Sequence, residues 1–341
     1  MSIELCHDRE SWDAYVNAAP QACNYHRWSW SEVIRQTYGH ECFYLASRSS
    51  NGQIDGVLPL VSIRSRLFGN SLVSVPFFSY GGVVSSDPTV REQLLARAVA
   101  LAGEIDARHI EIRQGEACGL SWVERSPKVT MEMDTPTTVD ELWKRMTTGM
   151  RNKIRNARKN NLRVEWSGSE ALNSFYSIFS RNMRDLGTPT YPQAWFENLY
   201  SHFPEQTRLL TIWDGVEAVA SGIVTCFRDR VELPWSGSTL QSRKKYSAVL
   251  MYWSVLEWAI ENGYRQVDFG RCTRGSGTYE FKKHFGCQER PLHWYYWLSP
   301  GVPVPELRPD NPKFKLATSL WRRLPLGVAN ILGPQVVRSI P

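Results

Sequence analysis

One order of predicted elements occurs twice along this chain, and that repetition constrains the fold more than any other feature. The first copy consists of strands 41–47, 53–63 and 71–78, a helix over 89–108 and a strand over 109–113. The second consists of strands 207–213, 216–227 and 231–237, a helix over 247–262 and a strand over 266–270. Asn51-Gly52 and Asp214-Gly215 mark the first hairpin turn of each copy. An antiparallel meander followed by a helix and one more strand predicts two mixed α+β units.

The two copies share no visible residue identity, so coincidence between common α/β patterns is the alternative interpretation. Between them, apolar residues at helical spacing predict helices over 138–160, 170–186 and 193–202. Pro127 and Pro136 interrupt the pattern before these helices, and a proline-rich segment follows the second copy. We therefore expect domains over 1–135 and 136–300, and a linker with an amphipathic tail over 301–341.

Composition excludes several classes of protein. The chain has 341 residues, of which 42% are hydrophobic and 22% charged, so disordered, collagen-like and coiled-coil chains are excluded. A membrane-spanning helix needs about 20 apolar residues, and no run approaches that length. The charged N-terminus predicts no signal peptide. The cysteines and histidines lack metal-binding spacing, which favours free thiols, a reducing cytoplasm and no metal or other bound cofactor.

Residues 151–159 carry five positive charges and no acid. On a helix, Arg151 and Arg155 occupy one face, where like charges four residues apart repel each other. A polyanionic ligand such as a phosphate or a nucleic acid would offset that repulsion. The alternative is a solvated helix face.

The junction between the predicted strand 231–237 and helix 247–262 is also basic, with Arg243, Lys244 and Lys245 in sequence. A helix N-terminus has unpaired N–H groups and a positive dipole end, and both favour a bound anion. The following helix is apolar nearly all round, so we expect it to be buried and the junction to be fixed. A plain polar connection is the alternative.

A third candidate segment covers residues 267–286. Asp268 ends a predicted strand, and a loop containing Gly275 and Gly277 follows it. We expect three cations from this segment to converge on an oxyanion or a phosphate, namely Arg271, Arg274 and Lys282. The alternative is an ordinary turn.

These segments together resemble the FemAB family of aminoacyl and acyl transferases. The second half carries the resemblance in 151–159, in Asp268-Phe269-Gly270, and in Phe281-Lys282-Lys283 with Gly286. The first half adds Leu58-Pro59-Leu60 and Val75-Pro76-Phe77, which leads to Tyr80-Gly81-Gly82. Residues 320–325 and 332–334 resemble the subgroup associated with exosortase (PEP-CTERM) and exopolysaccharide loci. The resemblance covers essentially the whole chain.

The resemblance implies an α+β fold of two tandem GNAT-like domains, that is, the acyl-CoA N-acyltransferase fold, with a BioF2-like acetyltransferase second domain. It also implies an acyltransferase that acts on an amine in a cleft between the domains. The residues it assigns to catalysis are Lys282, which stabilises the oxyanion or anchors a phosphate, and Phe281, Asp268 and Tyr279. The residues it assigns to substrate or donor binding are Arg151, Arg155, Arg243, Tyr246, Arg271, Arg274 and Tyr80.

Some positions depart from the family pattern. Arg243 and Ala248 fit the Q/R-x-x-G-x-G/A loop that binds CoA, but Tyr246 stands where glycine would let a pyrophosphate approach. This departure counts against plain acetyl-CoA, and the co-substrate that the resemblance implies is an acyl-CoA, a carrier-bound acyl group or an aminoacyl-tRNA. The expected acceptor is a phosphate-bearing sugar, peptide or glycan precursor of the cell envelope or of an exopolysaccharide. Asp87 is the nearest counterpart of the acid that the family has in its first domain.

The tail over 306–341 has six basic and two acidic residues. Apolar residues recur in it at helical spacing, namely Phe314, Ala317, Leu320, Trp321 and Leu324. A basic amphipathic helix of this kind lies on anionic membrane surfaces, so one prediction is peripheral contact with the inner membrane face from the cytoplasm. The alternative is that the tail packs on the first domain.

Two other functions remain open at this stage. The first is a nucleic-acid-binding module built on the basic helix over 151–159, which would bind nucleic acid in a salt-dependent manner without turnover. The modest net charge of +6 and the lack of a standard nucleic-acid motif count against it. The second is a non-catalytic scaffold of the same fold in polysaccharide assembly.

Overall fold

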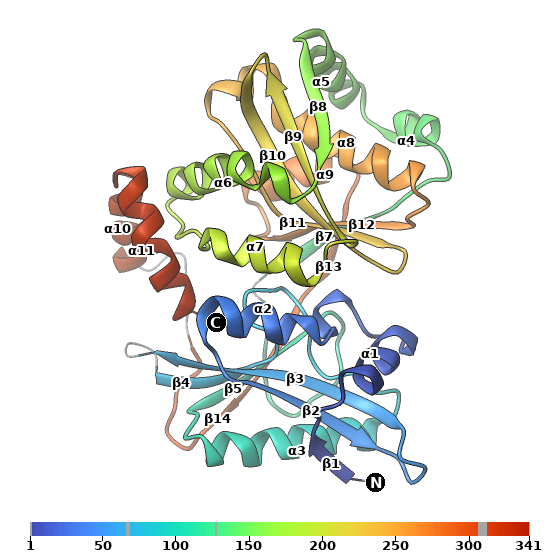
Figure 1. The fold of residues 1–341 in the computed structure, drawn as a ribbon, viewed down its shortest axis with the longest axis vertical. Coiled ribbons are helices and arrows are strands. Elements are labelled where there is room, and N and C mark those ends of the chain that lie inside the picture. Colours follow the sequence, from blue (N-terminus) through green and yellow to red (C-terminus); the bar gives the residue numbers. More distant parts are fainter. Residues whose placement is uncertain (1, 66–68, 127, 306–311, 341) are drawn as a thin grey trace. The chain divides into compact units, whose positions relative to one another are not determined.

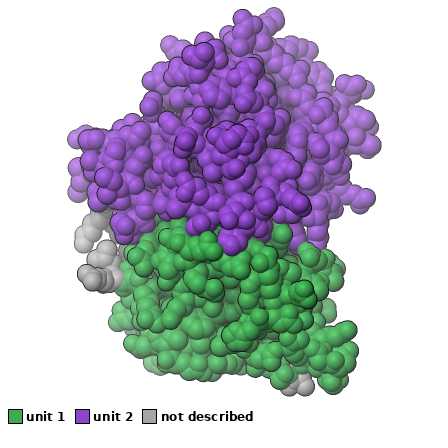
Figure 2. All heavy atoms as spheres, viewed as in Figure 1, with its two compact units in different colours: residues 1–127, 291–307, 337–341 green, residues 128–290, 308–336 purple. Residues whose placement is uncertain are grey.

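The computed structural model describes residues 2–65, 69–126, 128–305 and 312–340 (Figure 1). The chain divides into two compact units, which Figure 2 colours separately. Unit 1 comprises Met1–Pro127, Pro291–Leu307 and Val337–Pro341, and unit 2 comprises Lys128–Arg290 and Arg308–Val336. Each unit contains one mixed sheet of seven strands in its described residues.

The sheet of unit 1 consists of segments from both ends of the chain. Its order is β1 (Ser2–Leu5), β2 (Cys42–Arg48), β3 (Ile54–Ser65), β4 (Gly69–Val73), β5 (His109–Gln114), β14 (His293–Leu298) and β6 (Val123–Arg125). Among these strands, β4 and β5 pair in parallel. The helices are α1 (Arg9–Ala18), α2 (Ser29–Tyr38) and α3 (Pro88–Glu104), with a short 3-10 turn at Asn24–His26. The core lies between α3 and the sheet.

The sheet of unit 2 has the order β13 (Gln288–Pro291), β7 (Val129–Asp134), β12 (Gln266–Cys272), β11 (Arg230–Ser238), β10 (Glu217–Phe227), β9 (Thr207–Asp214) and β8 (Leu162–Ser167). Here β11 and β12 pair in parallel. The helices are α4 (Val139–Arg145), α5 (Thr148–Lys159), α6 (Leu172–Leu186), α7 (Gln193–His202), α8 (Ser247–Glu261) and α9 (Gly277–His284). Short 3-10 turns, η2 (Ser169–Ala171) and η3 (Gln241–Lys245), precede α6 and α8.

The predicted repetition is confirmed. In unit 1, the meander β2–β3–β4 is followed by α3 and then by β5, parallel to β4. In unit 2, β9–β10–β11 is followed by α8 and then by β12, parallel to β11. The mixed α+β class is confirmed as well.

The units differ from the predicted ranges 1–135 and 136–300 at two strands. β7, within residues 129–134, belongs to the sheet of unit 2, where it pairs with β12. β14, within residues 293–298, belongs to the sheet of unit 1, where it pairs with β5 and β6. Strand pairing between distant segments leaves no mark in local periodicity, so the sequence did not show either exchange.

Two predicted elements differ from their expected extent: one helix is divided in two, and one strand ends early. The helix over 138–160 is divided into α4 and α5, because Thr147 adopts an extended conformation and caps α5 by accepting the Met150 N–H. The strand over 71–78 ends at Val73, since Val75 and Phe77 have positive φ angles of 45° and 77°.

The buried helix α8 is the centre of the unit 2 core. Its apolar residues are covered by the sheet on one side and by α4 and α5 on another. Trp253 of α8 is 1% exposed and meets Trp143 of α4 edge to face, with ring centroids 5.4 Å apart. The expected burial of this helix is confirmed, and it fixes the junction at its N-terminus.

The C-terminal tail contains the helices α10 (Pro312–Trp321) and α11 (Leu326–Arg338). Arg184 of α6 donates to the Leu324 carbonyl at 3.1 Å, and Arg322 donates to the Leu186 carbonyl at 3.3 Å. The tail therefore contacts the end of α6 in unit 2, and its last residues, from Val337, belong to unit 1. Residues 306–311 and the side chains of 312–315, including Phe314 of the predicted stripe, lie outside the described part. No helix in the described part of the chain has the length and apolar character needed to cross a membrane.

We expect the returning strand β14 to be essential for the stability of unit 1. Tyr295 of β14 is 1% exposed and belongs to the core between α3 and the sheet. Tyr295→Ala should lower the free energy of unfolding by about 3 kcal/mol or more, because it leaves a cavity. As a control, Val123→Ala on the neighbouring strand β6, where Val123 is 39% exposed, should change it by about 0.5 kcal/mol at most. Equal effects in urea unfolding would contradict a structural role for β14.

Candidate functional site

The strands β11 and β12 separate after a short parallel ladder. Their pairing consists of Arg230 with Gln266, Val231 with Val267, and Glu232 with Asp268. Beyond these pairs β11 continues to Ser238 alongside β10, whereas β12 continues to Cys272 alongside β7. The edge of β11 that faces β12 therefore loses its strand partner after Glu232. Pro234 lies on this stretch, where its missing N–H interrupts no ladder between β11 and β12.

A bulge in β12 redirects that strand at the point of separation. The register between β12 and β7 shifts between Asp268 and Arg271. Gly270 within the bulge has a φ of +76°, which a residue with a side chain rarely adopts. Asp268 Oδ1 accepts the Gly270 N–H at 2.7 Å and the Thr130 hydroxyl at 2.5 Å. Asp268 is 2% exposed, so it acts here as a buried anchor for the bulge.

Arg230 is the cation at the centre of a group of three carboxylates on adjacent strands. Its Nη2 atom lies 2.6 Å from Glu132 Oε1 and 2.8 Å from Asp268 Oδ2. Its Nε atom lies 3.8 Å from Glu232 Oε1, and Arg290 approaches Glu132 at 3.7 Å. Burial raises the pKa of Glu132 despite the neighbouring Arg230. The cluster holds β7, β12 and β11 together directly before β11 and β12 separate.

Lys282 of α9 extends into the β12 bulge. Its side chain is 3% exposed, and Nζ donates to the Gly270 carbonyl at 2.8 Å and lies 3.5 Å from the Arg271 carbonyl. Burial lowers the pKa of Lys282. The ammonium therefore fixes the backbone of the bulge, and α9 positions the Lys282 side chain.

Phe281, which precedes Lys282 in the sequence, belongs to a wall of packed aromatic side chains. Phe281 is half-buried and meets Tyr252 of α8 edge to face at 5.0 Å and Phe285 at 5.3 Å. Tyr252 stacks on Phe269 of β12 at 4.7 Å. The wall connects α8, β12 and α9 within the unit 2 core.

The N-terminus of α8 begins where β11 leads into η3. Tyr246 precedes the helix with φ 60° and ψ 34°, a left-handed conformation that suits glycine, and its side chain makes no capping hydrogen bond. The first-turn N–H groups of α8 therefore receive no bond from the usual capping side chain. Arg243 is exposed beside this end, whereas Lys245 pairs with Asp214 at 2.5 Å.

The basic helix α5 lies against α8. Arg158 pairs with Glu257 of α8 at 3.0 Å, and the Arg155 guanidinium lies over the Trp143 ring at 5.2 Å. Arg151 donates to the Thr148 hydroxyl at 3.3 Å. Some of the basic side chains of α5 thus contact the neighbouring helices, although the Arg155 side chain remains exposed.

The contacts of Arg271, Arg274 and Lys282 do not show the predicted convergence of these three cations on one point. Arg274 pairs with Glu289 at 3.3 Å, and the Tyr279 hydroxyl donates to the same carboxylate at 2.7 Å. Arg271 is exposed, whereas Lys282 is buried. Arg274 thus contacts an acid and Lys282 contacts backbone carbonyls, so the two cations have different partners in this structure. The hydrogen bond to Glu289 raises the pKa of Tyr279, so the phenol stays protonated at neutral pH.

Unit 1 has the same strand arrangement, but the corresponding space is filled. β4 and β5 pair over Ser71–His109, Leu72–Ile110 and Val73–Glu111, and the chain after β4 then folds back. Arg113 of β5 is 2% exposed, bonds to Glu111 at 2.6 Å and to the Phe78 carbonyl at 2.7 Å, and lies 4.5 Å from the Trp294 ring centroid.

Tyr80 of unit 1 is 6% exposed and lies 5.5 Å from the Tyr25 ring, within this packed region. It is therefore in the other unit from the remaining predicted site residues. Asp87 caps α3 by accepting the Thr89 N–H at 2.8 Å. In unit 2 the strands separate at a bulge of β12 that is held by Asp268.

Sequence reasoning named Asp268 but missed Arg230 and its other two carboxylates, Glu132 and Glu232. Arg230 and Glu232 are two residues apart on β11, so strand periodicity alone places them on one face. Glu132 was missed because residues 127–138 read as a domain boundary, whereas residues 129–134 form β7.

Comparison with known proteins agrees with this geometry. Residues 144–283 match the family model described as an acetyltransferase (GNAT) domain. No curated protein sequence matches the chain.

Several solved structures share the fold over most of the chain. The crystal structure of FemX is similar with a TM-score of 0.68 and 18% identity, over 87% of this chain and 98% of that chain. L-PGS from Bacillus licheniformis gives 0.58 and 10%, over 93% and 98%. A tandem GNAT protein from the clavulanic acid biosynthesis pathway, determined without AcCoA, gives 0.54 and 12%, over 89% and 100%. The predicted fold of two tandem GNAT-like domains followed by a helical tail is confirmed.

Asp268→Asn tests the anchoring of the bulge. The substitution removes the charge that faces Arg230 at 2.8 Å in a buried position, so we expect a loss of about 3 kcal/mol or more in the free energy of unfolding. Asp134→Asn on the neighbouring strand β7 is the matched control. Asp134 is exposed and accepts from Gln266 at 3.2 Å, so its substitution should cost roughly 0.5 kcal/mol or less. If both variants unfold at the wild-type urea midpoint, Asp268 does not anchor the bulge.

Proposed function

We propose that unit 2 catalyses N-acyl transfer: an acyl or aminoacyl group moves from an activated donor to an amine. The observation that carries this proposal is the separation of β11 and β12 beside the N-terminus of α8. It lies in the segment that matches the acetyltransferase (GNAT) domain model. An extended donor arm would lie along the open edge of β11, and its anionic end would approach the α8 N-terminus.

The donor is an acyl-CoA, a carrier-bound acyl group or an aminoacyl-tRNA. All three end in a phosphate-bearing portion, for which the helix dipole and the exposed Arg243 are suited. Tyr246 already has the left-handed backbone conformation that a glycine would provide, but it retains a side chain at the position where a pyrophosphate would approach. The bulkier Tyr246 therefore favours donors that bind without close backbone contact at this point. The fold that the chain shares with the tandem GNAT protein, whose structure was determined without AcCoA, supports the acyl-CoA alternative.

The residues of the bulge would act on the reacting carbonyl. An ammonium group has three N–H donors. Two face the Gly270 and Arg271 carbonyls, which leaves one for the oxyanion that develops when the amine attacks. Phe281 would form the apolar wall, and Asp268 would hold the bulge in position. Direct attack by an amine on an activated ester or thioester needs no covalent enzyme intermediate.

Tyr279, Arg271 and Arg274 would orient the substrates at the outer side of the bulge. Arg151 and Arg155 on α5 would meet donor or acceptor phosphates. The acceptor we propose is an amine on a phosphate-bearing precursor of the cell envelope or of an exopolysaccharide. The support for this class of acceptor is the resemblance of the sequence to the FemAB family, together with the fold that the chain shares with FemX.

The tail would bring the enzyme to an anionic membrane surface. Large apolar side chains of α10 and α11 are exposed, in particular Leu316 (62%), Leu320 (55%) and Ile331 (71%). Arg322 and Arg323 lie between the two helices in the sequence. Exposed apolar groups beside basic ones suit the interface of an anionic bilayer.

Substitution of Lys282 tests the catalytic proposal. Lys282→Met keeps most of the alkyl volume and removes the ammonium, so turnover should fall by roughly 100- to 1000-fold while the protein stays folded. Acetyl-CoA and aminoacylated tRNA are first compared in a thermal-shift assay, because a donor that binds the folded state raises the midpoint. Turnover is then measured with that donor and an amine-bearing precursor.

Lys144→Met on α4 is the control, since Lys144 is exposed and lies outside the proposed site. It should retain wild-type turnover. Full activity in Lys282→Met would remove Lys282 from the mechanism. Failure of both donors to bind the wild-type protein would exclude an acyl-CoA and an aminoacyl-tRNA as donors. If an acyl group on a carrier protein also fails to bind, the acyl-transfer proposal is rejected and a scaffold role is favoured.

Flotation with liposomes tests the role of the tail. The full chain should float with vesicles that contain anionic lipid, and a chain that ends at residue 305 should not. Binding should weaken at high salt, because screening reduces the attraction between arginines and lipid headgroups. Equal flotation of the two chains would show that the tail is not the membrane contact.

A further inference from the structure

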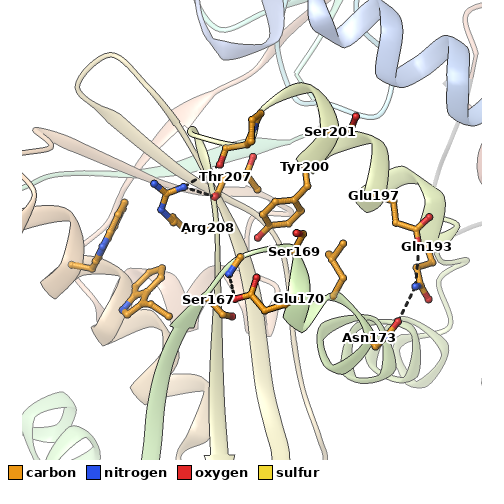
Figure 3. A pocket seen from close by; sticks show the side chains of 15 residues that line it. Ser167, Ser169, Glu170, Asn173, Gln193, Glu197, Tyr200, Ser201, Thr207 and Arg208 are labelled. Atoms are coloured by element: carbon orange, nitrogen blue, oxygen red, sulfur yellow. Dashed lines mark hydrogen bonds between the residues drawn. The ribbon is translucent and has the colours of Figure 1, made fainter.

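A pocket lies in unit 2 at the edge of the sheet that β8 forms, away from β12. It has a volume of about 960 Å³ and opens between the end of β8, η2, α6, α7 and the start of β9 (Figure 3). β8 is an edge strand, three strand positions from β11 in the sheet order. At about 4.8 Å per strand this is a separation of roughly 14 Å. The pocket is therefore distinct from the separation of β11 and β12.

Two buried hydroxyl groups in the lining of this pocket have no hydrogen-bond partner among the described residues. They are Tyr200 Oη on α7 and Thr207 Oγ1 at the start of β9. Tyr200 is 7% exposed and Thr207 is 0% exposed. In Figure 3 the Tyr200 side chain extends from α7 into the space beside Ser169 and Thr207. Burial raises the pKa of Tyr200, so its hydroxyl remains protonated and can donate. Buried hydroxyls are normally satisfied, and a ligand with its own hydroxyl groups would satisfy these.

The rest of the rim carries neutral amides and carboxylates. Gln193 Nε2 donates to Asn173 Oδ1 and to Glu197 Oε1, each at 3.0 Å, so one side chain orders two others. Glu170 accepts the Gly168 N–H at 2.8 Å, a bond that lowers the pKa of Glu170. These groups are positioned donors and acceptors at the mouth of the pocket.

The charge of the lining disfavours an anionic ligand. Glu170 and Glu197 are exposed carboxylates, whereas Arg208 is the single Lys or Arg among the lining residues. Arg208 donates to the Thr207 carbonyl at 2.8 Å and to the Pro204 carbonyl at 3.2 Å, so it is already engaged. A ligand here should be neutral or carry an amine.

Two half-buried tryptophans complete the pocket. Trp166 of β8 and Trp258 of α8 have ring centroids 4.9 Å apart and planes tilted by 31°. Both also line a smaller adjoining pocket of about 210 Å³. Tryptophan combines a large apolar ring with a polar N–H, which suits a ligand that has apolar faces and a polar rim.

We propose that this pocket binds a neutral or amine-bearing oligosaccharide. A sugar ring has an apolar C–H face for tryptophan and hydroxyl groups around its rim, which can bond to the unpartnered Tyr200 and Thr207 and to the ordered amides. The adjoining small pocket that shares both tryptophans leaves space for a second sugar unit. This inference does not depend on acyl transfer by unit 2.

Tyr200→Phe and Thr207→Val test the proposal, because each removes a hydroxyl that has no protein partner. Neither should lower the melting temperature. Each should weaken saccharide binding by about three- to tenfold, which corresponds to the loss of one neutral hydrogen bond. Titration of tri-N-acetylchitotriose, deacetylated chitotriose and maltotriose, followed by tryptophan fluorescence and calorimetry, measures the affinity. Inorganic phosphate is the anionic comparison.

Tyr176→Phe on α6 is the matched control. Its hydroxyl donates to the Tyr191 carbonyl at 3.0 Å and lies outside the pocket lining, so this variant should lower the melting temperature and keep the saccharide affinity. The proposal is overturned if none of the three saccharides binds at 10 mM or if phosphate alone binds. It is also overturned if Tyr200→Phe and Thr207→Val bind as tightly as the wild type.

Discussion

The sharing of Arg230 among three carboxylates is the interaction on which the unit 2 site depends. Glu132, Glu232 and Asp268 stand on three adjacent strands, and the desolvation of their charges is tolerated only because Arg230 lies between them. The cluster holds β11 and β12 together up to Asp268. Beyond it, the bulge at Gly270 directs β12 away. Because the Arg230 cluster holds β11 and β12 immediately before they separate, the geometry of the separation is fixed as well.

Comparison of the two units explains why the proposed chemistry belongs to unit 2. Both have a three-pair parallel ladder between the last meander strand and the strand after the helix. In unit 1 the space beyond the ladder is occupied by Arg113, which bonds to Glu111 and to the Phe78 carbonyl. In unit 2 the ladder between β11 and β12 ends after Glu232 and Asp268, and β12 turns away at its bulge, which is where we propose that the donor binds. One architecture thus supports a packed structural unit and a unit with a candidate site.

The sequence predictions are accurate where the interactions are local, and they fail where the interactions join residues that are far apart in the chain. The meanders and the buried helix α8 depend on local periodicity and turn residues, and they occur as predicted. β7 and β14 each belong to the other unit than predicted, because the strands with which they pair are distant in the sequence. The role of Lys282 was inferred from resemblance, whereas its contact with the Gly270 carbonyl depends on α9 folding back against β12. Arg274 was expected near Lys282, but the pairing of Arg274 with Glu289 was not visible in the sequence.

Apolar periodicity and turn residues act over a few positions, so local patterns were enough to predict two mixed α+β units of like order. They also indicated which segments carry unusual charge. The three-dimensional fold was needed to see which charges are paired, which strands belong to which sheet, and where buried hydroxyls such as those of Tyr200 and Thr207 lack partners among the described residues. Those properties depend on distances between residues far apart in the chain, and the free energy of a buried polar group is set by what surrounds it in space.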